Sequence, residues 1–218
     1  GIRNIRPKSS KLSTHHQLFQ QLSSSPLFVD STYGSSYTLS TSGGVAAALC
    51  EPGSADEWFV GGSGTLTSAG VLEVVNSGLS GASVEIHPYS STAALPTVLV
   101  RVNANSDKQV RLDSLVPGDD LMALEVITRA GRVTSFMFDQ RKKGLSNLGM
   151  DYVAAGISPS THLVIPIGRN SVGSNKMVHA LRLLAPGQVN ATVSVQLQSE
   201  DGSFTPVGLD SKVIVHGK

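Results

Sequence analysis

The chain has 218 residues, of which 40% are hydrophobic and 15% charged, and its formal net charge at pH 7 is +1. This length allows one large β domain or two small ones, and the near-neutral charge excludes the strong positive field of a nucleic-acid-binding protein. The single cysteine excludes an internal disulfide, and the many glycines and few aromatic residues favour short strands joined by tight turns over helical bundles.

Residues 1–44 differ in composition from the rest and are predicted to form an irregular N-terminal segment or linker. Residues 13–25 are compatible with a short helix or a strand. Residues 31–44 contain 11 Ser, Thr or Gly among 14 positions, which is typical of a flexible connector or an irregular edge-like strand. The chain begins with Gly1 and has no run of 18 apolar residues, so we expect any signal peptide or membrane anchor to lie outside it.

From about Val45 onward, alternating apolar and polar residues predict β-strands, with turns at the spacing typical of a sandwich. Residues 120–140 predict a hairpin that turns at Arg129–Arg132, where Gly131 supplies a backbone suited to the turn. The basic run at Arg141–Gly144 is interpreted as a solvated loop. The strand-like segments before these are residues 70–76, 82–89, 98–104 and 108–115.

An internal repeat is the most informative feature of the sequence. Residues 70–91 match residues 179–200 at a constant offset of 109, with apolar residues facing apolar residues at a period of two. The aligned pairs are Leu72 with Leu181, Val74 with Leu183, Gly78 with Gly187, Ala82 with Ala191, Val84 with Val193 and Ile86 with Val195. After a hairpin that is four residues longer, around residues 200–203, Val100 and Val102 align with Val213 and Val215.

The repeat predicts an all-β protein with two tandem, related β-sandwich units of immunoglobulin-like or jelly-roll-like type. The first unit is expected to span residues 45–155, and the second, partial unit to span residues 156–218. The first copy continues for about 30 residues past the position equivalent to Lys218. We therefore expect the second unit to be incomplete at its C-terminus, lacking its last three strands.

The residues around the only cysteine and the only tryptophan do not form a catalytic motif. Ser63 follows Gly61 but lacks the second glycine of a nucleophile elbow. Asp56 and Glu57 are adjacent, so on a strand they point to opposite faces and cannot form a glycosidase pair with each other. The carboxylates on the predicted strands, Glu57 included, are interpreted as solvated outer-face residues. Nothing in the sequence selects Glu73, Glu85 or Glu125 as a glycosidase partner for Glu57.

Neither the cysteine nor the histidines match the pattern of a catalytic or metal site. Cys50 is interpreted as a small buried hydrophobe. The six histidines have no metal-site spacing; they are His15, His16, His87, His162, His179 and His216. We therefore expect no catalytic residues, no metal and no cofactor.

Trp58 permits two hypotheses. It can fill the space between two packed sheets, as large aromatics do in many sandwiches. Alternatively, it can be an exposed platform on which a sugar ring stacks, in which case Trp58 and Tyr89 are the candidate ligand-binding residues.

The motifs occur in an order that resembles a known family. The series comprises residues 58–62 (WFVGG), 72–78 (LEVVNSG), 82–89 (ASVEIHPY), 111–118 (RLDSLVPG), 179–187 (HALRLLAPG) and 191–197 (ATVSVQL). It is similar to secreted or membrane-anchored actinobacterial envelope proteins known only as a domain of unknown function. The sequence departs from that pattern at Asn76-Ser77-Gly78, where Asn-Pro-Gly is expected. The resemblance implies the fold and an extracellular or envelope location, and it transfers no catalytic residue.

We therefore expect a non-catalytic extracellular or cell-envelope β-sandwich module with a structural or interaction role, rather than an enzyme. The alternative is a carbohydrate-binding module for cell-wall glycan. The expected partners are cell-wall polysaccharide or another envelope protein, with no nucleic acid, and with a membrane only through an anchor outside this chain. Open sheet edges would also allow strand pairing between chains and hence oligomerisation.

Overall fold

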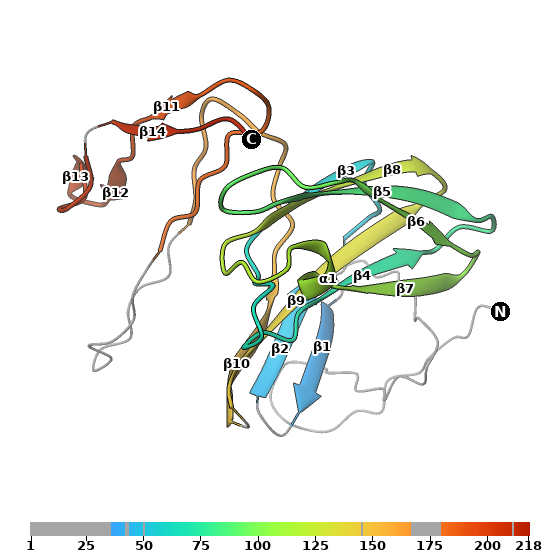
Figure 1. Cartoon of the computed structure of the whole chain (residues 1–218). Helices are drawn as coiled ribbons and strands as arrows, with labels where there is room; N and C mark the ends of the chain where they lie inside the picture. Colours follow the sequence, from blue (N-terminus) through green and yellow to red (C-terminus); the bar gives the residue numbers. More distant parts are fainter. Residues whose placement is uncertain (1–35, 42–43, 50, 145, 167–179, 211) are drawn as a thin grey trace.

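The computed structural model describes residues 36–41, 44–49, 51–144, 146–166, 180–210 and 212–218. Within these ranges the protein is built almost entirely of antiparallel strands, as the sequence predicts, and its only helix has four residues. No helix in the described residues is long and apolar enough to cross a membrane. A two-sheet sandwich forms the main body, and a smaller group of C-terminal strands extends from it (Figure 1).

Two four-stranded sheets make up the sandwich. Sheet I has the order β3-β8-β5-β6, with β3 at Asp56–Val60, β8 at Ala123–Ala130, β5 at Ala82–Tyr89 and β6 at Val98–Val102. Sheet II has the order β10-β9-β4-β7, with β10 at Ser146–Val153, β9 at Val133–Lys143, β4 at Val71–Asn76 and β7 at Ser106–Arg111. A separate hairpin precedes them, formed by β1 (Ser36–Thr41) and β2 (Gly44–Leu49). Strand β1 therefore lies within the predicted N-terminal linker.

The core lies between the two sheets and follows from the period-two pattern of the strands. In β4 every second residue is buried, and in β5 the same alternation runs over all eight residues. Leu72, Val74, Val84 and Ile86 are fully buried. Helix α1 (Leu112–Leu115) closes one end of this core with its buried leucines.

The predicted hairpin at Arg129–Arg132 is wrong. Strand β8 belongs to sheet I and β9 to sheet II, so the chain crosses from one sheet to the other instead of folding back on its neighbour. Gly131 makes this crossing with a φ of 90°, and a Cβ atom there would lie 2.6 Å from the Cβ of Ala82. Alternation identifies the buried face of each strand, but it does not tell which strand is its partner, because both sheets bury one face in the same core.

The basic run is also not a free loop. Residues 141–143 end the long strand β9, and Arg141 forms ion pairs with Asp139 (2.9 Å) and Asp120 (2.6 Å). The hydroxyl of Ser68 donates to the second oxygen of Asp139. These contacts tie the β9–β10 hairpin to the loops at the end of the sandwich.

Asn76 fixes another sheet crossing, between β4 and β5. Its side chain is fully buried, and its amide nitrogen lies within hydrogen-bond distance of the carbonyl oxygens of Ser80, Val102 and Asn103. Its amide oxygen accepts from the backbone N–H of Gly78. The side chain thus satisfies backbone groups from two segments, the β4–β5 turn and the end of β6.

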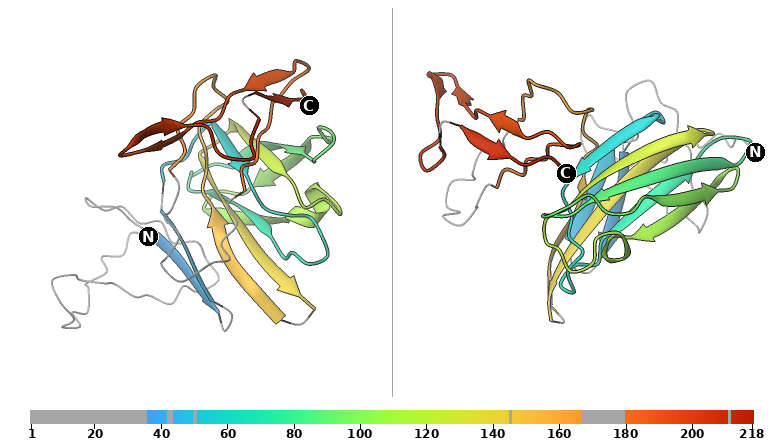
Figure 2. Two further views of the ribbon diagram at one scale, coloured as in Figure 1. Left: turned by 90° about the vertical axis from the view of Figure 1, so that its left-hand side faces the viewer. Right: turned by 45° about the horizontal axis from the view of Figure 1, so that its top comes forward.

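The C-terminal residues form two small sheets of their own. Strand β11 (Ala191–Val193) pairs with β14 (Val213–Val215), and the hairpin of β12 (Leu197–Ser199) and β13 (Gly202–Phe204) lies between them in the sequence. Two further views show that these strands extend from the sandwich and belong to neither of its sheets (Figure 2).

Candidate functional site

The second unit reproduces part of the first at the level of strand register. In the sandwich, β5 and β6 pair with Ala82 opposite Val102 and Val84 opposite Val100. In the C-terminal sheet, Ala191 lies opposite Val215 and Val193 opposite Val213. These are the residues that the repeat alignment makes equivalent. The register of β11 and β14 is therefore the one that the repeat alignment predicts for this pair, which makes β11 and β14 the counterparts of β5 and β6.

The counterpart of β4 is residues 180–185, and it differs from β4 in its pairing. Strand β4 is paired along its whole length on both sides, by β7 and by β9. Within the described residues, no strand pairs with residues 180–184, and Ala185 makes only an isolated bridge to Gly217. We call residues 180–184 the open segment.

Apolar side chains are exposed on the open segment. Leu181 and Leu183 are 46% and 38% exposed, whereas the equivalent Leu72 and Val74 are fully buried. Leu72 and Val74 are buried because sheet II packs face to face on sheet I, where they share the core with Val84 and Ile86. Leu181 and Leu183 are not covered to that degree. Within the described residues, the open segment thus combines backbone groups that pair with no strand and exposed apolar side chains, a combination that favours the addition of another strand.

The second unit is held against the first by contacts at both of its ends. Near its start, the Arg182 guanidinium donates to the carbonyl of Gly62 (2.8 Å). At its end, the ammonium of Lys218 donates to the carbonyl of Ser90 (3.1 Å) and to that of Ser91. These bonds place the open segment beside the edge of sheet I.

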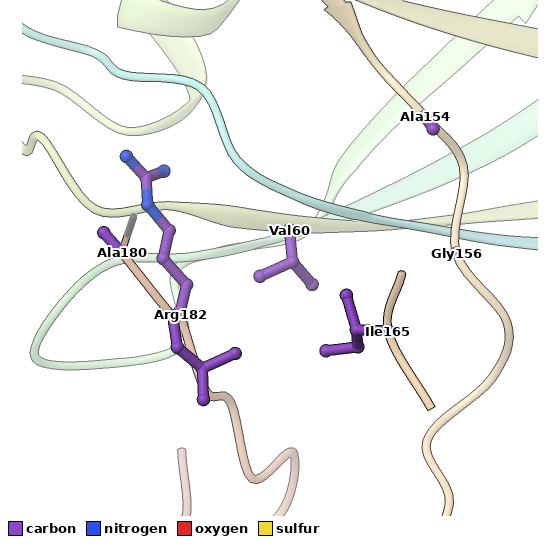
Figure 3. Close-up of a pocket in the computed structure, with 7 residues that line it drawn as sticks. Val60, Ala154, Gly156, Ile165, Ala180 and Arg182 are labelled. Atoms are coloured by element: carbon purple, nitrogen blue, oxygen red, sulfur yellow. The ribbon is translucent and has the colours of Figure 1, made fainter. Parts of the chain in front are cut away.

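A pocket of 380 Å³ lies between that edge and the open segment. Its walls are mostly aliphatic and come from three parts of the chain: strand β3, the stretch after β10 and the open segment (Figure 3). The lining residues are Val60, Ala154, Gly156, Ile165, Ala180, Leu181 and Arg182. Arg182 is the only charged residue among them.

Trp58 is buried, but it does not lie between the two sheets. Its neighbours Glu57 and Phe59 point into the sandwich, so Trp58 points outward from sheet I. It is only 5% exposed, and its ring stacks on that of Tyr89 at 5.9 Å with an interplanar angle of 24°. Both candidate ligand-binding residues are therefore brought together, and their mutual stacking takes up one face of the indole.

Polar groups surround this aromatic pair on the outer face of sheet I. The register places Trp58 and His87 on either side of Glu125. Burial, followed by repulsion from Asp56, raises the pKa of Glu125, whereas the hydrogen bonds from Arg129 lower the pKa of Glu85. Two buried polar atoms of this face have no hydrogen-bond partner within the described residues, Asp56 Oδ1 and Trp58 Nε1, whereas His87 Nε2 lies 3.4 Å from the carboxylate of Glu85.

A comparison with known protein families shows which family the chain belongs to. The family described as "Family of unknown function (DUF5719)" matches residues 25–218, which is all but the first 24 residues. The chain belongs to this family. No curated protein matches it. The resemblance seen in the sequence is therefore confirmed at the level of the family, which has no assigned function.

Two solved structures resemble parts of this DUF5719 protein. One is titled "Crystal Structure of Thermotoga maritima 1070"; it is 15% identical, covers 48% of this chain and 94% of its own, and has a TM-score of 0.43. The other is the "Anabaena sensory rhodopsin transducer", which is 22% identical, covers 38% of this chain and 95% of its own, and has a TM-score of 0.33. Neither likeness is close enough to carry an argument about function.

Glu57 is buried, so its interpretation as a solvated outer-face residue is wrong. It is 6% exposed and points into the sandwich, where its Oε2 accepts from the backbone N–H of Ser135 on β9 (3.0 Å). Burial raises its pKa from 4.5 to about 7, and the nearby Glu51 and Asp56 add to this, while hydrogen bonding by Ser135 opposes it. The signal was present in the sequence, because Glu57 alternates with Phe59, a core residue.

The other acidic, histidine and cysteine residues considered in the sequence do not come together in one site. Within the residues that the structure describes, no group of three His, Cys, Asp or Glu side chains is placed to hold a metal ion. Glu73 is on β4 of sheet II, whereas Glu85 and Glu125 are on the outer face of sheet I, so none of the three faces Glu57 inside the sandwich. Cys50, His15, His16 and His179 lie outside the described residues.

Proposed function

We propose that this DUF5719 protein is a non-catalytic interaction module of the cell envelope, which binds another polypeptide by strand addition to its second unit. The ordered motifs that resemble secreted and membrane-anchored envelope proteins support the location. The binding role rests on the open segment, where residues equivalent to the doubly paired strand β4 have no strand partner among the described residues.

The physical basis is the free energy available at the open segment. A strand added there would form backbone hydrogen bonds along residues 180–184 and would cover Leu181 and Leu183. Full burial of a leucine side chain contributes about 1.5–3 kcal/mol, so two half-exposed leucines supply a substantial part of a binding energy. The first unit shows an equivalent arrangement, because β9 pairs with β4 as the added strand would pair with the open segment.

Carbohydrate binding through Trp58 and Tyr89 has less support. A sugar-stacking platform requires an exposed aromatic face, whereas Trp58 is 5% exposed and stacks on Tyr89. The polar groups around the pair make ion pairs and hydrogen bonds among themselves, such as Glu85 with Arg129 and Thr97 with His87.

A peptide that copies residues 133–141 of the chain tests strand addition. In the first unit this part of β9 pairs with β4 from Val133 opposite Asn76 to Phe138 opposite Val71. The labelled peptide should bind the whole chain saturably and should slow amide hydrogen exchange at residues 180–184. A scrambled peptide of the same composition is the control.

Two variants of the chain locate the binding. Leu183→Asp places a charge on the open segment and should abolish binding of the peptide. Leu99→Asp is the matched control, because Leu99 is an exposed leucine on the edge strand β6 of the sandwich, away from the open segment. Binding that is absent in the natural chain, or unchanged in Leu183→Asp, would overturn the proposal.

A further inference from the structure

We infer that the pocket beside the open segment receives one large aliphatic side chain from the added strand, at the position opposite Leu181. This inference rests on the proposed strand addition and names the chemistry of the partner: an extended polypeptide with a Met- or Leu-type anchor at that position. Two independent observations lead to it, the lining of the pocket and the register of the repeat.

The lining of the pocket is suited to an uncharged anchor. Val60, Ile165 and the methylene stem of Arg182 surround a common space, and the guanidinium of Arg182 is directed away from it (Figure 3). That guanidinium donates to the carbonyl of Gly62, so its charged end is held at the edge of strand β3. A carboxylate or hydroxyl placed among these aliphatic walls would lose its hydration without gaining a partner.

The pocket is continuous with the open segment, since Ala180 and Leu181 belong to both. An added strand that pairs with residues 180–184 would therefore carry a side chain along this wall. Peptides that join a sheet edge commonly gain affinity from the backbone bonds and specificity from pockets that take alternate side chains. The arrangement here has both components.

The register of the first unit identifies which residue of the added strand meets the pocket. Leu72, the counterpart of Leu181, lies opposite Met137 of β9. Met137 is fully buried in the core, next to Leu72. An added strand in the same register would place its equivalent of Met137 beside Leu181, and a volume of 380 Å³ accommodates a side chain of that size.

The experiment compares two peptides against the natural chain and a pocket variant. One peptide copies residues 133–141, and the other is the same peptide with Met137→Ser. The pocket variant is Val60→Asp, because Val60 is 45% exposed on the edge strand β3 and lines the pocket. Affinities are measured by fluorescence anisotropy of the labelled peptides.

We expect Met137→Ser in the peptide and Val60→Asp in the chain each to weaken binding by about tenfold, as loss of a buried aliphatic contact does. The two changes should not add, because they remove the same contact. Ala154→Leu, which fills the pocket without adding charge, should also weaken the methionine peptide, whereas the surface variant Leu99→Asp should bind as the natural chain does.

The outcomes separate the two proposals. If the methionine and serine peptides bind equally, and neither Val60→Asp nor Ala154→Leu changes the affinity, strand addition stands and the anchor pocket is refuted. If neither peptide binds the natural chain, strand addition itself is refuted and the anchor pocket with it.

Discussion

Replacement of Glu57 by glutamine should remove a pH dependence from the stability of the sandwich. The carboxyl group of Glu57 is buried between the two sheets, and burial raises its pKa to about 7 in the folded protein. In the unfolded chain the group titrates at its ordinary value of 4.5. The folded state therefore binds the proton more tightly than the unfolded state does.

The sign and size of the effect follow from this difference. The contribution of Glu57 to the free energy of unfolding is fully present below the unfolded pKa, decreases as the pH rises from 4.5 towards 7, and is lost above the folded pKa. At about 1.4 kcal/mol for each pKa unit, the loss amounts to about 3 kcal/mol. Glu57→Gln keeps the shape of the side chain without the ionisation, so it should be more stable than the natural chain above neutral pH.

The assay is urea unfolding of both proteins at a series of pH values from about 4 to about 8, a range that includes both pKa values. Other carboxyl groups also titrate, so the informative quantity is the difference between Glu57→Gln and the natural chain at each pH. That difference should grow by about 3 kcal/mol across the range. Ser203→Ala, an exposed change on β13 that removes no ionisable group, should give a flat difference. A flat difference for Glu57→Gln would refute the burial argument.

Three further predictions concern stability and burial. Asn76→Ala should lower the free energy of unfolding, measured in urea, by about 2–4 kcal/mol, because buried backbone groups lose their hydrogen-bond partners. The control Asn103→Ala, at an exposed side chain, should change that free energy by less than about 0.5 kcal/mol. Equal effects of the two substitutions would contradict the assigned hydrogen bonds. Equivalent leucines in the two copies of the repeat should contribute differently to stability. Leu72→Ala should lower the free energy of unfolding by about 3 kcal/mol, and Leu181→Ala should lower it by less than about 1 kcal/mol. Similar losses would mean that the open segment is covered. The fluorescence emission of Trp58 should be blue-shifted in the folded chain and insensitive to cell-wall polysaccharide, whereas quenching by polysaccharide would favour the carbohydrate-binding alternative.

The register of the repeat was predictable because it depends on apolar periodicity. The offset of 109 residues aligned Val84 with Val193, and the structure gives each of them the equivalent cross-strand partner, Val100 and Val213. Period-two alternation also identified the buried residues of β4 and β5. These features are local, since each strand carries its own pattern of buried and exposed positions.

The pairing of the strands and the environment of single residues required the tertiary structure. The sequence placed a hairpin at Arg129–Arg132, where the chain instead crosses between sheets, because alternation shows a strand's buried face and not its partner. Trp58 was assigned either to the inter-sheet core or to an exposed platform, and it is buried on the outer face of sheet I against Tyr89. An aromatic residue carries no local signal that distinguishes these positions.

The sequence by itself determined that the protein is all-β, that it contains a repeated sandwich pattern, and that Leu181 and Leu183 occupy core-type positions. The tertiary structure decided that these two leucines are partly exposed, whereas the equivalent Leu72 and Val74 are buried in the core between the two sheets. It also decided that Glu57 is buried and that the open segment lies beside an aliphatic pocket. Burial depends on which segments meet in space, whereas the apolar pattern records only which face of a strand is built to be covered.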